Sequence, residues 1–302
     1  MEAQMLLKRH HRNFYYQYLC KINGRVILED LDYQNLRNYL KGFEGEYAFF
    51  EHIKDFEQLV RIWDLTLDMF GTAQYDFLFI ANDTVIHIDI KNYSGLYRFD
   101  NGNFISEQGY VHQGLLSQLD RAHRKLEQFI KMNHFQYKVN SRILFVNPEF
   151  KLKGYNGNEH IVLFSQMTEV INYLKTLVSH NEDMKLGLLL VEHHVDKDYN
   201  RVHFYDYDYI EKGIKCVSCG AIGMFEEKSQ RTMQCICGFE IGKKDYIIEA
   251  IEDISLFKNG SFTRKELEKY TGVNATTLKR YLHQYCEKIG SFKDATYKIK
   301  KD

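Results

Sequence analysis

Long apolar segments are absent from this 302-residue sequence. The longest apolar runs, such as the six residues from Leu186 to Val191, are far shorter than the roughly 20 residues that cross a bilayer. The N-terminal residues MEAQMLLKRHHRNFYY lack the apolar core and the small-residue cleavage site of a secretory signal peptide. We therefore predict a soluble protein with no membrane partner.

Cysteines are also too few for a disulfide scaffold, with six in the whole chain. A chain of this length can instead build two or three small hydrophobic cores. The low cysteine content favours a reducing compartment and predicts a cytoplasmic protein.

A global excess of positive charge is missing, because 40 Lys and Arg face 41 Asp and Glu. The distribution is nevertheless uneven: residues 258–302 hold eleven basic and five acidic residues, and residues 8–25 hold five basic residues and no acidic one. Basic ends around an acidic middle fit a protein that binds nucleic acid and holds a metal. Charge runs are also typical of ordinary solvated surfaces.

The hydrophobic patterns predict an α/β fold with a mixed sheet flanked by helices. A basic helical arm is expected over residues 1–41, and a second helix begins near Gly42. Two strands follow, joined by the tight turn Ala81-Asn82-Asp83. The predicted elements are strands at 75–80 and 84–90, a helix at 115–131, a strand at 142–146, a helix at 166–178 and a strand at 186–191.

Side-chain alternation places Asp89 and Lys91 on one face of the second strand. A turn centred on Asn82-Asp83 would set Asp76 directly opposite Asp89. Facing carboxylates repel each other, and a divalent cation between them would remove that cost. Lys91 beside the cation could position or deprotonate a water molecule, which is the chemistry of phosphodiester hydrolysis. The plain alternative is a polar face on a half-buried sheet.

The context of these residues resembles the nuclease-related domain (NERD) family of the PD-(D/E)xK nucleases. The resemblance covers roughly residues 42–150 and rests on Gly42-Phe43-Glu44-Gly45-Glu46, on Asp76 before a strand, on Asp89-Ile90-Lys91-Asn92-Tyr93-Ser94-Gly95 and on Gln118 in a helix. One position departs, because the family usually has Glu where this chain has Asp89.

The resemblance implies a restriction-endonuclease-like core and a Mg²⁺- or Mn²⁺-dependent nuclease. It assigns Glu46, Asp76 and Asp89 to the metal, Lys91 to catalysis and Gln118 to a supporting role. The expected substrate is DNA. A non-catalytic DNA-binding regulator or an interaction adaptor on the same scaffold remain alternatives, and the oligomeric state is open between a monomer and a homodimer.

Two cysteine pairs predict a zinc ribbon over residues 214–240. Cys216 and Cys219 form a C-x-x-C pair, Cys235 and Cys237 form a C-x-C pair, and a glycine that allows a tight turn follows each. Four thiolates make a closed tetrahedral Zn²⁺ site, which is structural because no position stays open for water. Cys20 and Cys286 are expected to be ordinary buried or half-buried residues.

The last segment, residues 245–302, is predicted to resemble a winged helix. Thr263 begins a capping box, Asn274 caps the next helix, and a basic hairpin closes the chain. The residues expected on the exposed side of the second helix, where DNA would bind, are Thr276, Thr277, Lys279 and Arg280. Small helical modules of this kind also serve in protein interactions.

Two weaker motifs carry no predicted function. Asp196-x-Asp198-x-Asn200 resembles the start of a calcium loop, but Arg201 stands where glycine is required. The pairs His10-His11 and His193-His194 lack partners at ligand spacing, so we predict that they are surface histidines.

Residues 42–205 are expected to form the nuclease domain.

Overall fold

The computed structural model of the chain describes residues 5–196, 201–226, 231–291 and 295–300. The chain divides into two compact units, one formed by Met1–Asn13 with Arg37–Lys197 and the other by Phe14–Leu36 with Asp198–Asp302. We call them unit 1 and unit 2. Residues 1–41, expected as one arm, are thus divided between both units.

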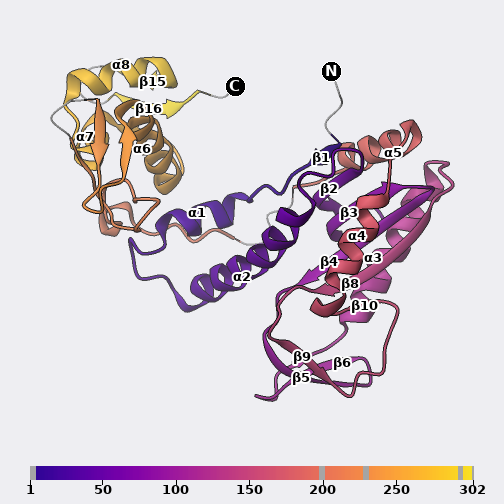
Figure 1. Cartoon of the computed structure of the whole chain (residues 1–302). Coiled ribbons are helices and arrows are strands. Elements are labelled where there is room, and N and C mark those ends of the chain that lie inside the picture. Colours follow the sequence, from indigo (N-terminus) through magenta and orange to yellow (C-terminus); the bar gives the residue numbers. More distant parts are fainter. Residues whose placement is uncertain (1–4, 197–200, 227–230, 292–294, 301–302) are drawn as a thin grey trace. The chain divides into compact units, whose positions relative to one another are not determined.

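Unit 1 is built on a six-stranded mixed sheet with the order β1-β2-β3-β4-β8-β10 (Figure 1). The strands are β1 (Leu6–Lys8), β2 (Val60–Leu67), β3 (Ala73–Ala81), β4 (Thr84–Lys91), β8 (Lys138–Phe145) and β10 (Ile161–Val162). β2, β3 and β4 are antiparallel neighbours, whereas β1 joins β2 in parallel and β8 joins both β4 and β10 in parallel. The predicted mixed sheet is confirmed.

Helices cover both faces of this sheet. The buried residues of α3 (Leu115–Met132) and α5 (Asn181–Glu192) pack against one face, together with Leu78 and Ile80 of β3. The later turns of α2 (Asp30–Ile53) and helix α4 (Met167–Thr176) cover the other face. The apolar stripe predicted for α3 is buried throughout: Leu115, Leu119, Ala122, Leu126, Phe129 and Ile130.

A smaller four-stranded sheet extends unit 1, with the order β7-β6-β5-β9. Its strands are β5 (Gly95–Asp100), β6 (Asn103–Ser106), β7 (Val111–His112) and β9 (Phe150–Lys153). Phe104, Phe145 and Phe150 share a core here, and the rings of Phe145 and Phe150 stack at 4.1 Å. A short 3₁₀ turn, η1 (Phe164–Gln166), precedes α4.

Two predicted elements are wrong. Residues 186–191 are not a strand but lie in α5, which begins with a capping box at His180 and Asp183. Short apolar runs do not separate a buried strand from a buried helix, and Gly187 lets this helix approach Leu7 and Val60 closely. No helix begins near Gly42 either, because α2 runs through both Gly42 and Gly45 as one helix of 24 residues.

Unit 2 has one hydrophobic core shared by α1 (Phe14–Ile22) and the C-terminal helices. Its later elements are η2 (Tyr207–Tyr209), β11 (Phe225–Glu226), β12 (Thr232–Gln234), β13 (Glu240–Gly242), α6 (Lys243–Lys258), β14 (Phe262–Thr263), α7 (Arg264–Thr271), α8 (Ala275–Tyr285), β15 (Cys286–Ile289) and β16 (Thr296–Ile299). Two three-stranded antiparallel sheets form, in the orders β11-β12-β13 and β14-β16-β15.

A buried ion pair ties the N-terminal part of unit 2 to its C-terminal helices. Arg25 lies 3.5 Å from Asp253, and both side chains are only 1% exposed. Arg25 also donates to the carbonyl oxygens of Glu211 and Gly213, and Tyr270 donates to Asp253 at 2.9 Å. Removing either partner would leave the other as an unpaired buried charge, which is strongly destabilising. Residues 14–36, which supply Arg25, are therefore an integral part of unit 2.

Some sequence predictions fall outside the described residues. Asp198 and Asn200 of the rejected calcium motif do so, and so do residues 292–294 of the expected basic hairpin. Among the residues that are described, no helix is long and apolar enough to span a membrane.

Candidate active site

The hairpin of β3 and β4 has the predicted register. Its pairs run from Ala81↔Thr84 to Phe77↔Ile88, and Asn82 and Asp83 form the turn with positive φ angles of 51° and 54°. Asp76 and Asp89 occupy the next position, beyond the last ladder pair. There the Oδ2 atom of Asp76 accepts a hydrogen bond of 2.7 Å from the backbone N–H of Ile90.

Asp89 and Lys91 share one face near the end of β4. The Nζ atom of Lys91 lies 2.5 Å from Oδ2 of Asp89, and the two side chains are 18% and 16% exposed. Burial opposes the charged form of Lys91, but the carboxylates of Asp89 and Asp76 outweigh it and raise the Lys91 pKa above its usual value. Lys91 is therefore a firmly held cation.

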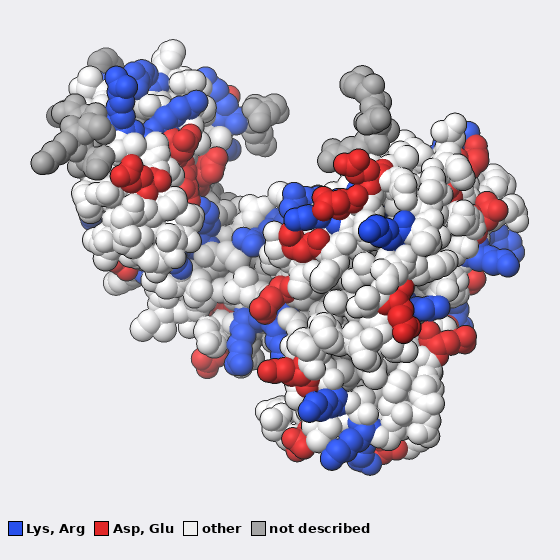
Figure 2. All heavy atoms as spheres, in the orientation of Figure 1, with Lys and Arg blue, Asp and Glu red and all other residues white. Residues whose placement is uncertain are grey.

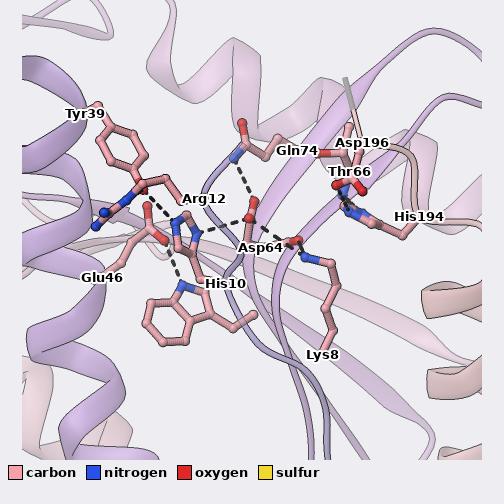
Figure 3. Close-up of polar contacts among 11 residues, drawn as sticks. Lys8, His10, Arg12, Tyr39, Glu46, Asp64, Thr66, Gln74, His194 and Asp196 are labelled. Carbon is pink, nitrogen blue, oxygen red and sulfur yellow. Dashed lines mark hydrogen bonds and ion pairs between the residues drawn. The ribbon is translucent and has the colours of Figure 1, made fainter. Parts of the chain in front are cut away.

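Glu46 reaches the same place from α2. A side chain at Gly45 would meet Cβ of Asn92 at 2.7 Å, so the glycine lets the helix approach the end of β4. Asn92 secures this approach by donating to the carbonyl oxygen of Lys41 at 2.8 Å. Oε2 of Glu46 accepts a 2.8 Å hydrogen bond from Nε1 of Trp63 (Figure 3).

The three carboxylates influence one another electrostatically. Burial raises the pKa of Asp76 well above its usual range, and the neighbouring charges of Glu46 and Asp89 raise it further. Burial also raises the pKa of Glu46, although the Trp63 hydrogen bond and the nearby His10 and Lys91 act in the opposite direction. A cation near Asp76 would relieve this repulsion.

Gln118 is placed differently from the other predicted residues. It lies in the first turns of α3, with an exposed side chain. Within the described part of the chain, no hydrogen bond or ion pair joins its side chain to Glu46, Asp76, Asp89 or Lys91. The structure brings those four side chains together and leaves Gln118 outside the group.

Three neighbouring residues were missed by the sequence analysis: His10, Trp63 and Asp64. The prediction that His10 is a surface histidine is wrong, since its side chain is 13% exposed and its Nδ1 lies 3.0 Å from Oδ2 of Asp64. His194 is also enclosed, with Nδ1 accepting from the backbone N–H of Thr66 at 3.0 Å. The available signal was an aspartate in the middle of a strand-like segment, Val60–Leu67, that is rich in large apolar residues.

The carboxylate group suits a hard divalent cation in its chemistry. Mg²⁺ prefers oxygen ligands and commonly uses one or two carboxylates together with water and phosphate. Within the described residues, each carboxylate has one oxygen in a polar contact, namely Oδ2 of Asp76, Oδ2 of Asp89 and Oε2 of Glu46. The second oxygen of each remains available to a cation, so the residues fit Mg²⁺ or Mn²⁺.

The four cysteines form a second candidate metal site, in unit 2. Their Sγ atoms all lie within 4.8 Å of one another, which no other group of three or more His, Cys, Asp or Glu among the described residues achieves. Two sulfur–sulfur contacts cross between the pairs, at 3.7 Å for Cys216–Cys237 and 3.5 Å for Cys219–Cys235. This cluster could hold a metal ion.

Two tight turns shape the cysteine cluster. Gly220 and Gly238 have positive φ angles of 76° and 89°, and their N–H groups donate to the carbonyl oxygens of Cys216 and Cys235. The glycines thus serve the turns as predicted. Cys286 is buried and Cys20 is half-buried, and both lie outside the cluster.

The helices α7 and α8 begin where the sequence indicated. Thr263 forms a capping box with Glu266, and the side chain of Asn274 accepts from the N–H of Thr277 at 2.9 Å. On α8, Thr276, Lys279 and Arg280 are exposed and Thr277 is half-buried. Lys and Arg side chains cover the end of unit 2 that carries α8, with acidic side chains beside them (Figure 2).

Comparison with known proteins bears on unit 1 alone. Neither a curated protein nor a solved structure matches the chain. A family match covers about a third of the chain and includes Glu46, Asp76, Asp89, Lys91 and Gln118, but neither the cysteine cluster nor the C-terminal helices. Residues 41–146 match the nuclease-related domain (NERD).

Proposed function

We propose that the chain is a nuclease that hydrolyses phosphodiester bonds of DNA with Mg²⁺ or Mn²⁺. The observation that carries the proposal is the convergence of Glu46, Asp76, Asp89 and Lys91 from α2, β3 and β4. Half-buried carboxylates so close that two of them raise the pKa of the third are costly in a purely structural role, and such groups are common at functional sites.

The four side chains have separate roles in this proposal. Asp76 and Asp89 would hold the cation, and Glu46 would complete its ligands. When bound, the cation polarises the phosphate and stabilises negative charge on the attacking and leaving oxygens. Lys91, charged through its ion pair with Asp89, is suited to orient the attacking water and the phosphate rather than to remove a proton. We keep Gln118 as a supporting residue of the site, which would act only through contact with the bound substrate.

Unit 2 would bind the DNA substrate. The order α6, β14, α7, α8, β15 and β16 resembles a winged helix, in which the second helix of the turn enters a DNA groove. Thr276, Thr277, Lys279 and Arg280 would face the DNA from α8. The four cysteines would hold a structural Zn²⁺, because a full set of thiolates leaves no open position for catalysis.

A cleavage assay with the full chain tests the catalytic part. We expect Asp89→Asn and Lys91→Met to lower the rate of Mg²⁺- or Mn²⁺-dependent cleavage of supercoiled DNA by about 100- to 1000-fold. Asp83→Asn and Lys138→Met, at an exposed turn and an exposed strand end of the same sheet, are matched controls that keep full activity. Parallel assays on linear DNA, single-stranded DNA and RNA define the substrate.

A second candidate is a DNA-binding protein on an inactive nuclease scaffold. The observation in its favour is that the oxygens of Glu46, Asp76 and Asp89 are not gathered within 4.8 Å, unlike the four sulfur atoms. No Mg²⁺- or Mn²⁺-dependent cleavage by the wild type above the level seen with Asp89→Asn, together with tight DNA binding, would establish this alternative and reject the nuclease.

A further inference from the structure

The side-chain alternation of β2 and β3 breaks at one shared position. Trp63 pairs with Phe77, and Leu65 pairs with Tyr75, so Asp64 lies opposite Asp76. In regular strands residues i and i+2 share a face. Here Trp63 and Phe77 belong to the core under α2, whereas Leu65 and Tyr75 belong to the core under α3.

The backbone of Asp64 produces this break. Its φ angle is 65°, a left-handed conformation that is uncommon for a residue other than glycine inside a strand. An unfavourable conformation of this kind persists only where the surroundings hold it, and such residues cluster at functional sites. The irregular position lies directly beside the proposed catalytic Asp76.

The N-terminal segment neutralises Asp64. β1 pairs with β2 and ends at Lys8, whose Nζ lies 3.9 Å from Oδ2 of Asp64. Two residues further along the chain, Nδ1 of His10 lies 3.0 Å from the same oxygen. Gln74 donates to Oδ1 at 3.1 Å. Burial alone would raise the pKa of Asp64, but His10 and Lys8 lower it, so this carboxylate already has partners within the protein.

His10 also connects this ion pair to Glu46. Its ring lies 5.5 Å from the ring of Trp63, and its Nε2 is 2.9 Å from the hydroxyl of Tyr39. Trp63 is 1% exposed and is stacked on Phe50 at 4.5 Å, so the direction of its Nε1–H is tightly constrained. That N–H donates the 2.8 Å hydrogen bond to Oε2 of Glu46.

We propose that His10 and Asp64 are positioning residues of the candidate nuclease site. Through Trp63 they fix the Glu46 carboxylate so that its second oxygen is presented to the divalent cation. The inference rests on the proposed function and adds a segment that lies outside the matched residues 41–146. Replacing residues that orient metal ligands in this way commonly weakens metal binding by about 10- to 100-fold.

Binding of Mn²⁺ to the zinc-loaded full chain tests the inference, with free Mn²⁺ followed by its electron paramagnetic resonance signal. We expect His10→Ala, Asp64→Gly and Trp63→Phe each to raise the Mn²⁺ dissociation constant by about 10-fold or more. Glycine at position 64 keeps the positive φ angle, and phenylalanine at position 63 keeps the ring while removing the N–H donor.

One further variant and one kinetic measurement distinguish a positioning role from a purely structural role in holding β1 against β2. His194→Ala removes another enclosed histidine that contacts β2 through Thr66, and we expect its Mn²⁺ affinity to equal that of wild type. At saturating Mn²⁺ the kcat of His10→Ala should return to near the wild-type value, whereas that of Asp89→Asn should stay low.

The outcomes distinguish the inference from the function beneath it. Wild-type affinity in folded Trp63→Phe and His10→Ala would overturn the positioning role and leave the nuclease proposal standing. Absence of Mn²⁺ binding in the wild type would overturn both. If His10→Ala fails to fold, Trp63→Phe and His10→Gln decide the question by the same measurement.

Discussion

The two candidate metal sites of this chain are organised in opposite ways. The four thiol groups of unit 2 lie within 4.8 Å of one another and are held by the backbone turns at Gly220 and Gly238. The three carboxylates of unit 1 stand wider apart and are each held by a protein donor: the N–H of Ile90, Nε1 of Trp63 and Nζ of Lys91. A closed cluster suits a permanent structural ion, whereas an open one leaves room for water and phosphate.

The consequences for stability should therefore differ between the sites. A metal ion in the thiolate cluster would join two loops of unit 2, and removing it would free both. A metal ion at the carboxylates would relieve repulsion in a sheet that is already covered by helices on both faces. Loss of the first ion should unfold structure, and loss of the second should stop chemistry.

Zinc removal should give the largest effect. Structural zinc binding contributes roughly 10 kcal/mol or more in small domains. Because unit 2 also has its own core, we expect Cys235→Ser to lower the stability of unit 2 by about 4 kcal/mol, or its Tm by about 15 °C. Calorimetry should detect this while the transition of unit 1 stays in place.

Metal analysis supplies the complementary test. Freshly purified, reduced protein should contain one zinc per chain, and Cys235→Ser should contain none. Cys20→Ser is the matched control, since Cys20 lies outside the cluster. Zinc-free wild-type protein with an unchanged transition for unit 2 would contradict the structural zinc and remove the contrast between the sites.

An intermediate effect is expected at Asp76. Its folded-state pKa lies above the ordinary value of 3.8, so its contribution to stability is full below pH 3.8 and is lost as the pH rises through the folded-state pKa. At neutral pH without Mg²⁺ the charged Asp76 destabilises unit 1. We expect Asp76→Asn to be more stable than wild type by about 1 to 2 kcal/mol at pH 7.5, and the difference should be smaller at pH 4.5, where more of the folded protein has Asp76 protonated.

Urea unfolding of zinc-loaded protein at pH 7.5 and pH 4.5 measures this difference. Added Mg²⁺ should stabilise the wild type and leave Asp76→Asn unchanged. Asp83→Asn, the same substitution at an exposed turn of the same hairpin, should change neither value. If Asp76→Asn is less stable than wild type at pH 7.5, Asp76 stabilises the fold, and its role is structural like the role proposed for the four cysteines.

Local patterns allowed part of this site to be predicted from sequence. The Asn82-Asp83 turn determined the register that aligns Asp76 with Asp89, and the stripe of α3 followed from its helical spacing. The contacts of His10 with Asp64 could not be predicted in that way, because they join segments 54 residues apart through the pairing of β1 with β2. Residues 186–191 were predicted as a strand because a short apolar run suits a buried strand and a buried helix equally well, and the close approach of Gly187 to Val60 is a tertiary contact that composition does not reveal.

The smallest expected effect concerns DNA binding by α8. Deletion of residues 245–302 would be a poor test, because it would remove the partners of α1 in the core and leave Arg25 without Asp253. Charge reversal at the exposed residues Lys279 and Arg280 avoids this damage. We expect the double variant to bind DNA about 5- to 10-fold more weakly at moderate salt. The slope of log affinity against log salt should fall by up to about 2, because each phosphate that the protein no longer neutralises lowers it by about 1.

Charge reversal at Lys131 and Lys175, both exposed in unit 1, gives the same change in net charge and serves as the control. The control should keep the wild-type slope, and cleavage at saturating DNA should be equal in both double variants, since neither alters the carboxylates. If Lys279 and Arg280 can be reversed without any change in the salt slope, α8 does not bind DNA phosphates. Unit 2 would then be better explained as a zinc-stabilised protein-interaction module, and any DNA binding would have to come from unit 1 itself.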